Sequence, residues 1–217
     1  EFRRVLFRSE TFTYFDLTTP NNVRITSIVN HILQDKDGNL WFSTNGQGLF
    51  RYNLSKNYLE QYEFTSAFGI VASTMADSDN QIWALTNQGE SGVYKLNKAE
   101  NKFEPFGLLY NAGNHHSQAL AMLEDSEQTL WLGTWECGLQ KIDKYTRQTT
   151  TYLHPTDGKG VTHIHSLMEY APHQLLIGSD DGLLLFNTLT EEYKLFTENE
   201  TVPNSLSNRF EIGRAHV

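Results

Sequence analysis

The side chains that could carry chemistry in this sequence are clustered histidines, one cysteine and three recurring aspartates. The clustered histidines are His115, His116, His163 and His165, with His154 and His173 nearby. Histidines two apart on a strand can share a face and bind a metal, but no carboxylate or further histidine lies at a spacing that completes a ligand set. Cys137 has no identifiable partner base. The sequence therefore predicts no catalytic residue, no metal and no cofactor.

The aspartates Asp35, Asp77 and Asp125 could be taken for catalytic carboxylates. Each stands six residues before a tryptophan, and a group that every copy of a pattern needs serves the fold. We expect these carboxylates to accept hydrogen bonds from backbone N–H groups in a turn. The run Asp35-x-Asp37-x-Asn39 also resembles the start of a calcium loop, but Leu40 stands where that loop needs glycine. No calcium site is predicted.

The aspartates belong to an internal repeat whose anchors are Trp41, Trp83, Trp131 and Leu176. The anchors are spaced by 42, 48 and 45 residues. In the fourth copy, Tyr170 replaces the aspartate and Leu176 replaces the tryptophan. After each anchor a short loop ends in a glycine, at Gly48, Gly92, Gly138 and Gly182. Each copy is therefore one structural unit of 40 to 50 residues.

Each unit is predicted to form four short strands, because apolar and polar residues alternate and the helical period is absent. The first strands are expected at 28–33, 70–75, 119–123 and 164–168, and the fourth strands at 58–64, 102–106, 149–153 and 192–196. Four strands in a unit of this length are typical of a β-propeller blade. We expect the first strand to be innermost and buried on both faces, and each anchor tryptophan to fill the gap between two blades.

The predicted fold class is therefore all-β, a β-propeller fragment of about four blades. The expected blades are 24–64, 68–107, 116–154 and 161–197, with partial blades at 10–16 and 205–211. Residues 1–9 and 212–217 resemble translated sequencing adapters and are expected to be non-native. The natural segment would then be 10–211, a metagenomic fragment that cannot close a ring.

The pattern Asp-x-x-Gly-x-Leu-Trp, followed by Thr, Gly-Leu and a closing Asp or Asn, resembles the two-component regulator propeller repeat. Its best copies are residues 32–41 and 130–134. The resemblance implies a seven-bladed ring in the periplasmic sensor region of a hybrid histidine kinase, joined to further blades and a downstream kinase, in a homodimer. It also implies a response to oligosaccharides that controls polysaccharide-utilisation genes. No kinase, receiver or DNA-binding signature is present, so this segment would contribute sensing only.

Composition limits the partners. The chain of 217 residues has a formal net charge of −9, which argues against a phosphate-binding surface and hence against nucleic acid. The longest apolar runs, such as 183–186, are far too short to cross a bilayer. We therefore expect no nucleic-acid partner and no membrane contact by this segment.

Loops that depart from the repeat are expected to gather on one end of the blades, which we call the hub face. It comprises the loops that enter each first strand and those that join second to third strands. The candidate ligand-binding residues there are Asn45, Gln47, Gln88, Glu90, Tyr110, His115, His116, Trp135, Glu136, Asp180 and Asp181. Trp135 stands where other copies have Asn or Asp. An aromatic ring beside amides and carboxylates suits a sugar; alternatively, Trp135 packs on the neighbouring loop.

Two other functions remain open at this point. A protein-interaction propeller without a small-molecule ligand would show an apolar hub face, which the polar loops oppose. A propeller enzyme similar to streptogramin lyases would share the Gly-x-Leu-Trp strand. Those enzymes carry a recurrent Ile-Gly-Arg-type third strand, whereas the third strands here begin with Gly-Leu or Gly-Val. The leading hypothesis is a non-enzymatic, ligand-sensing propeller.

Overall fold

The structure is a computed structural model that describes residues 17–64, 69–86, 92–108, 118–154 and 160–197. These residues form sixteen strands and no helix. The strands are β1 (Val29–Gln34), β2 (Leu40–Thr44), β3 (Leu49–Asn53), β4 (Tyr58–Tyr62), β5 (Val71–Ala76), β6 (Ile82–Thr86), β7 (Gly92–Asn97), β8 (Lys102–Leu108), β9 (Ala119–Glu124), β10 (Leu130–Thr134), β11 (Leu139–Ile142), β12 (Thr149–Tyr152), β13 (Ile164–Ala171), β14 (Gln174–Ser179), β15 (Gly182–Asn187) and β16 (Tyr193–Phe196). The described part of the chain has no helix long and apolar enough to span a bilayer. The predicted partial blades at 10–16 and 205–211 and the adapter-like ends lie outside the described residues.

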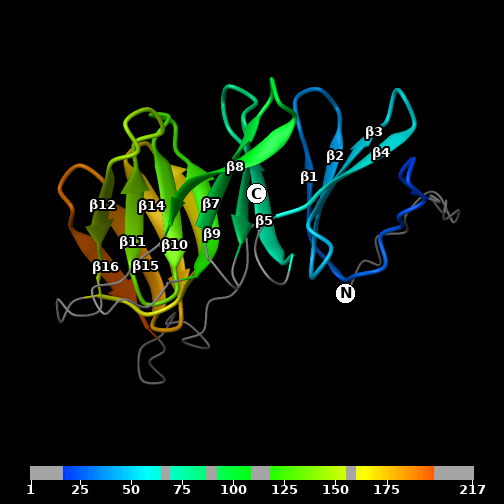
Figure 1. The fold of residues 1–217 in the computed structure, drawn as a ribbon. Helices are drawn as coiled ribbons and strands as arrows, with labels where there is room; N and C mark the ends of the chain where they lie inside the picture. Colours follow the sequence, from blue (N-terminus) through cyan, green and yellow to red (C-terminus); the bar gives the residue numbers. More distant parts are fainter. Residues whose placement is uncertain (1–16, 65–68, 87–91, 109–117, 155–159, 198–217) are drawn as a thin grey trace, which may run out of the picture.

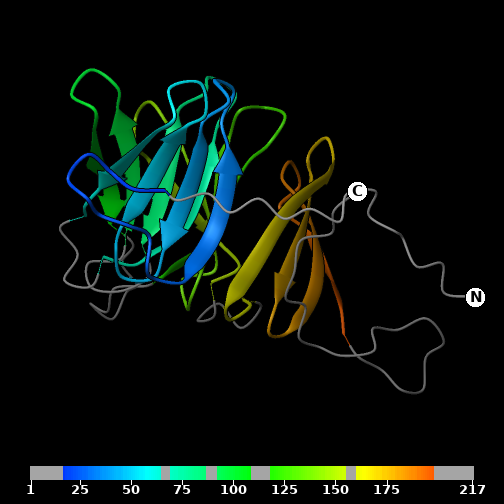
Figure 2. The same ribbon diagram turned by 90° about the vertical axis from the view of Figure 1, so that its right-hand side faces the viewer.

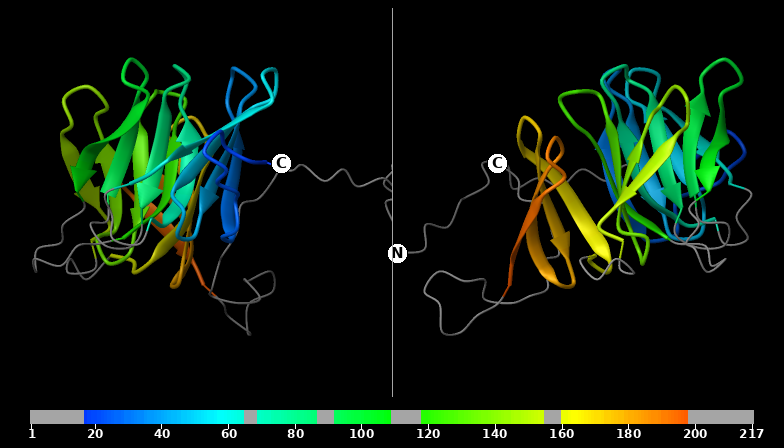
Figure 3. Two further views of the ribbon diagram at one scale, coloured as in Figure 1. Left: turned by 45° about the vertical axis from the view of Figure 1, so that its right-hand side comes forward. Right: turned by 90° about the vertical axis from the view of Figure 1, so that its left-hand side faces the viewer.

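The strands form four antiparallel sheets, each with its four strands in chain order. We call them blades one (β1–β4), two (β5–β8), three (β9–β12) and four (β13–β16). The blades follow one another in chain order from blue to orange (Figure 1). Blade four, yellow to orange, stands apart from the others in Figure 2 and in the right-hand view of Figure 3. The first strands are neighbours, since β1 contacts β5, β5 contacts β9 and β9 contacts β13. The prediction of an all-β propeller fragment is confirmed.

The core lies between the blades rather than within them. Trp41, Trp83 and Trp131 are each at most 1% exposed, and each packs against the following blade. Trp41 meets Phe103 of blade two edge-on at 6.1 Å between ring centroids, and Trp131 meets Phe186 of blade four at 6.0 Å. Burial of a large apolar side chain contributes about 1.5–3 kcal/mol. The three tryptophans therefore hold the blades together.

The prediction that the first strands are buried on both faces is wrong. The most buried strands are β6 and β10, in which every residue is buried, whereas β5, β9 and β13 are partly exposed. The first strands border an axial cavity of about 460 Å³, so one side of each meets open space. On β1 and just before it, Ile32 and Ile28 are 59% and 70% exposed, because no described blade covers that side.

Each anchor tryptophan is held by an aspartate. The Oδ1 atom of Asp125 accepts hydrogen bonds from the backbone N–H groups of Glu127 and Thr129, at 3.0 and 2.8 Å. Its Oδ2 atom accepts the indole N–H of Trp131 at 2.7 Å. Asp35 and Asp77 make the same set of bonds in blades one and two. The spacing of six residues is therefore the spacing at which one carboxylate both closes the turn and holds the indole.

A cation completes this unit from the neighbouring strand. Lys141, the cross-strand partner of Trp131, places its ammonium 5.9 Å from the indole centroid. Arg51 lies over Trp41 and Lys95 over Trp83 in the same way. Blade four replaces all three members, with Tyr170, Leu176 and Leu185. The unit is thus kept or lost as a whole.

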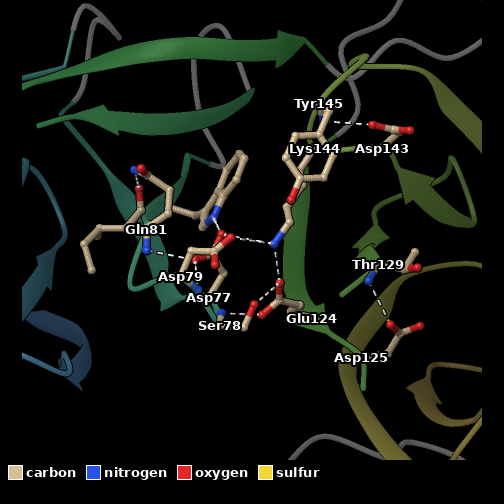
Figure 4. Close-up of polar contacts among 12 residues, drawn as sticks. Asp77, Ser78, Asp79, Gln81, Glu124, Asp125, Thr129, Asp143, Lys144 and Tyr145 are labelled. Carbon is tan, nitrogen blue, oxygen red and sulfur yellow. Dashed lines mark hydrogen bonds and ion pairs between the residues drawn. The ribbon is translucent and has the colours of Figure 1, made fainter. Parts of the chain in front are cut away.

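At the end opposite the hub face, polar side chains join neighbouring blades. The Glu124 carboxylate accepts hydrogen bonds from the backbone N–H and hydroxyl of Ser78, and Glu169 binds Ser126 of blade three in the same way. Lys144 also reaches from blade three to blade two (Figure 4). Its ammonium, on a side chain that is 5% exposed, lies 2.7 Å from Glu124 and 3.4 Å from Asp79. These contacts fix blade three against blade two and blade four against blade three.

Candidate functional site

Features shared by the blades build the propeller, so residues that occur in only one blade are the candidates for function. Of the predicted hub-face residues, Gln88, Glu90, Tyr110, His115 and His116 lie outside the described residues. The others all lie in loops between second and third strands. They are Asn45, Gln47, Trp135, Glu136, Asp180 and Asp181.

Gln47 and Asp181 fasten the hub-face loops of their own blades. The Gln47 Oε1 atom accepts hydrogen bonds from the backbone N–H groups of Thr26 and Ser27 at 2.7 and 2.8 Å. The Oδ2 atom of Asp181 accepts the backbone N–H and the hydroxyl of Thr162 at 2.9 and 3.0 Å. The two side chains therefore hold the segment that enters the first strand, in blade one and in blade four.

Four other residues converge between blades three and four, and we call them the His–Asp–Trp cluster. They are Trp135, His163, His165 and Asp180. The Oδ2 atom of Asp180 lies 2.5 Å from Nδ1 of His163, and its Oδ1 atom lies 2.6 Å from Nε2 of His165. Trp135 stacks on His163, with ring centroids 3.5 Å apart and planes inclined by 22°. One carboxylate thus holds two imidazoles, one of them against an indole.

Three separate segments supply this cluster. Trp135 follows β10, and its backbone N–H is bonded to the carbonyl oxygen of Gln118 at 2.9 Å. His163 precedes β13 and His165 lies within it, while Asp180 lies in the turn between β14 and β15. Because β13 packs against β9 and β10 of blade three, the histidines face the loop that carries Trp135. The cluster is therefore a contact between two blades.

The pKa of Asp180 is lower than that of an ordinary aspartate. Partial burial acts to raise this pKa, but the hydrogen bonds from His163 and His165 outweigh it, and the positive charge of the rings adds to their effect. The Asp180 carboxylate is therefore ionised at neutral pH. The cluster remains partly open, since Trp135 is 39% exposed and the side chains of both histidines are 20% exposed.

The sequence indicated Trp135 and Asp180 but missed the part played by the two histidines. No carboxylate lies close to them in sequence, and Asp180 is 17 and 15 residues away. The signal that could have indicated the histidines is that His163, His165 and Asp180 all fall at the hub face. Among the described residues no group of three or more His, Cys, Asp or Glu side chains could hold a metal ion. Instead, each ring uses one nitrogen to bind the carboxylate.

Two other features belong to the packing. Cys137 is buried, and its backbone N–H donates to the hydroxyl of Thr134 at 3.0 Å. A groove of about 350 Å³ at the outer edge of blades two and three contains Lys95 and Arg147. Lys95 lies over Trp83 and the Arg147 guanidinium lies 5.1 Å from the ring of Phe106. The His–Asp–Trp cluster therefore remains the candidate functional site.

The fold and the repeat define a class, the β-propellers whose blades are tandem four-stranded units. The family described as two component regulator propeller matches residues 22–46, which span the end of the segment entering β1 and the first two strands of blade one. This match confirms the resemblance that the Asp-to-Trp pattern indicated for blade one.

Two relatives extend this comparison. Histidine kinase P4 of Formosa agariphila is 26% identical over 189 residues, a match that covers 82% of this chain and 13% of that protein. The extracellular domain assigned to a hybrid two component system of B. thetaiotaomicron superposes with a TM-score of 0.69 and 24% identity, covering 82% of this chain and 23% of that domain. The chain thus spans only a small part of these relatives.

A propeller enzyme has a similar fold. Virginiamycin B lyase from Staphylococcus aureus, solved with quinupristin, superposes with a TM-score of 0.64 and 17% identity, covering 83% of this chain and 58% of that one. At this level of identity the likeness shows the fold alone.

Proposed function

We propose that this chain is part of the periplasmic ligand-sensing propeller of a hybrid two-component sensor kinase. In this proposal the parent protein contains the remaining blades of a seven-bladed ring and a downstream kinase, acts as a homodimer, and controls glycan-utilisation genes in response to an oligosaccharide. The similarity to a histidine kinase and to an extracellular sensor-system domain supports the sensor role.

The proposed oligosaccharide ligand rests on one observation, the exposure of Trp135 beside the polar atoms of the His–Asp–Trp cluster. The stack on His163 is the packing contact that the sequence offered as an alternative to ligand binding. The two are compatible, because 39% of Trp135 is still exposed. An indole held by a stacked ring is already ordered, so a sugar that packs on it need not bear the entropic cost of fixing it.

A ligand at this cluster would contact blades three and four together. It would therefore favour one relative placement of the two blades, and a signal would follow if that placement differs between the active and inactive sensor. In our proposal this preference is passed through the ring and the dimer to the kinase.

The test is the affinity of the full-length sensor for a panel of oligosaccharides, measured by calorimetry with and without the substitution Trp135→Ala. We expect a loss of affinity of about tenfold, because a stacked aromatic contact contributes about 0.5–1.5 kcal/mol in addition to the area that it buries, and about 1.4 kcal/mol corresponds to tenfold. Tyr145→Ala is the matched control, since Tyr145 is 77% exposed and lies at the opposite end of blade three. Unchanged affinity in Trp135→Ala contradicts the site, and failure of every oligosaccharide to bind contradicts the ligand class.

A further inference from the structure

The hydrogen bonds of the His–Asp–Trp cluster determine which ring nitrogen carries the hydrogen in each neutral histidine. An ionised carboxylate can only accept, so His163 donates from Nδ1 and His165 donates from Nε2. The other nitrogen of each ring, Nε2 of His163 and Nδ1 of His165, is then a hydrogen-bond acceptor. This is the cluster in its neutral form.

Proton uptake changes this contact at three points. Imidazole is the side chain that ordinarily gains its charge between pH 8 and 5. An imidazolium donates a stronger, charge-assisted hydrogen bond to Asp180, and on His163 it places a cation against the indole of Trp135, which is a favourable cation–π geometry. The second nitrogen of each charged ring becomes a donor instead of an acceptor.

The surrounding charges favour the same change. Asp180 is shared by both rings and remains ionised through this range. The other titratable groups on the adjoining described segments are Glu136 beside Trp135, Asp181 in the turn of Asp180, and His154 at the start of the loop that leads to Thr162. In β9, β10 and β14 the residues near the hub face are uncharged, and Glu124 and Glu169 lie toward the other end of their strands. Among these described groups, the carboxylates outnumber the one further histidine whose charge could oppose protonation.

We propose that the His–Asp–Trp cluster is a proton-responsive contact between blades three and four. Acidification from pH 8 to pH 5 tightens the junction at the hub face and converts the cluster from one that accepts hydrogen bonds to one that donates them. For the ligand this means that binding at the hub face depends on pH, and this last step rests on the proposed function.

The contact itself can be tested without any ligand, through the fluorescence of Trp135. An imidazolium stacked on an indole quenches its emission, so the difference in emission between the chain and its Trp135→Phe variant isolates the signal. We expect this difference signal to be lost as the pH falls from 8 to 5. His163→Gln should remove the pH dependence, whereas His173→Gln, which changes a histidine in the β13–β14 turn, should leave it intact. Far-ultraviolet circular dichroism at each pH establishes that all variants are folded.

The outcomes separate the two proposals. If His163→Gln shows the same pH dependence as the unchanged chain, or if the difference signal does not change with pH, the proton-responsive contact is wrong and the proposed function is unaffected. If a variant does not fold, the Hε1 resonances of His163 and His165 in the unchanged chain supply the test, because only coupled rings titrate together with the indole resonances of Trp135. If the contact titrates but the full-length sensor binds no oligosaccharide at any pH, the proposed function fails alone.

Discussion

The carboxylate of Asp125 and the indole N–H of Trp131 are joined by a hydrogen bond of 2.7 Å between residues six positions apart. The same carboxylate closes the turn between the first and second strands. One side chain thus couples the shape of a turn to the orientation of the tryptophan that fills the gap to the next blade. This pair determines both how a blade folds and how it docks.

A double-mutant cycle tests this coupling. Asp125→Ala and Trp131→Phe each remove one end of the bond, and their effects on the free energy of unfolding in urea should be non-additive by about 1–2 kcal/mol. The control pair is Asp125→Ala with Trp41→Phe, two blades away, for which additivity within about 0.5 kcal/mol is expected. A cycle that closes additively for Asp125 and Trp131 would show that the bond has no energetic role.

The substitution Gly138→Ala should destabilise the chain more than Gly38→Ala. Both glycines have positive φ angles, +67° and +80°, so both substitutions carry the backbone cost of about 1 kcal/mol. A Cβ atom at Gly138 would also collide with the carbonyl oxygens of Tyr152 and Leu153, whereas nothing lies within 4 Å at Gly38. Equal shifts in the urea midpoint for the two variants would contradict this reading of the turn.

Lys144 is expected to be essential to the junction of blades two and three. Lys144→Met leaves Asp77 and Glu124, which are 2% and 10% exposed, without their cation, and should cost about 3 kcal/mol of unfolding free energy. Lys56→Met, in the exposed turn after β3, is the matched control. If the two variants unfold at the same urea concentration, the buried contacts of Lys144 do not stabilise the chain.

The stabilisation by Lys144 depends on pH with a defined sign. Burial acts to lower the pKa of Lys144, but the hydrogen bond and charge of Glu124, with those of Asp77 and Asp79, raise it above 10.5 overall. A raised pKa means that the stabilisation is complete below pH 10.5 and is lost as the pH rises through the value in the folded chain. Unfolding free energy should therefore fall more steeply above pH 10.5 in the unchanged chain than in Lys144→Met.

The stabilisation by Asp180 depends on pH with the opposite sign from that by Lys144. Its pKa is lowered from 3.8 in spite of partial burial, through the hydrogen bonds from both histidines. Its contribution to stability is therefore complete above pH 3.8 and is lost as the pH falls through the folded value. In Asp180→Asn this contribution to stability is absent at every pH. Acid unfolding followed by circular dichroism should therefore differ between this variant and the unchanged chain. An identical acid limb in the two proteins would rule out a stabilising role for the carboxylate.

The exposed side of blade one predicts self-association. Ile28 and Ile32 are 70% and 59% exposed, and an open strand face of this kind promotes aggregation. We expect the chain expressed alone to be poorly soluble, and the double substitution Ile28→Lys with Ile32→Lys to increase the monomeric fraction measured by light scattering; this double variant is the background for the unfolding and spectroscopic measurements. A monodisperse monomer with a sharp thermal transition, obtained without these substitutions, would contradict this expectation.

Much of the fold could be predicted because the blades repeat the same local sequence pattern of turn, anchor and loop residues. The strands around Trp41, Trp83 and Trp131 lie within a few residues of their expected positions. The burial of the first strands was misjudged because burial depends on the neighbours in space, and the axial cavity between blades leaves no trace in any one repeat. The histidine pair was missed for the same reason, since Asp180 reaches His163 and His165 only after β13 and β14 have paired.

The glutamate–serine contacts between blades give the array a direction. Blade three has both halves, since Glu124 reaches back to blade two and Ser126 receives Glu169 of blade four. Blade two has Ala76 in place of the glutamate, and blade four has Ala171 in place of the serine. Of the four described blades, blade three alone could therefore be copied in tandem with every such joint satisfied. Blade three is therefore a unit that could be repeated, whereas each of the other three blades fits only one position in the order.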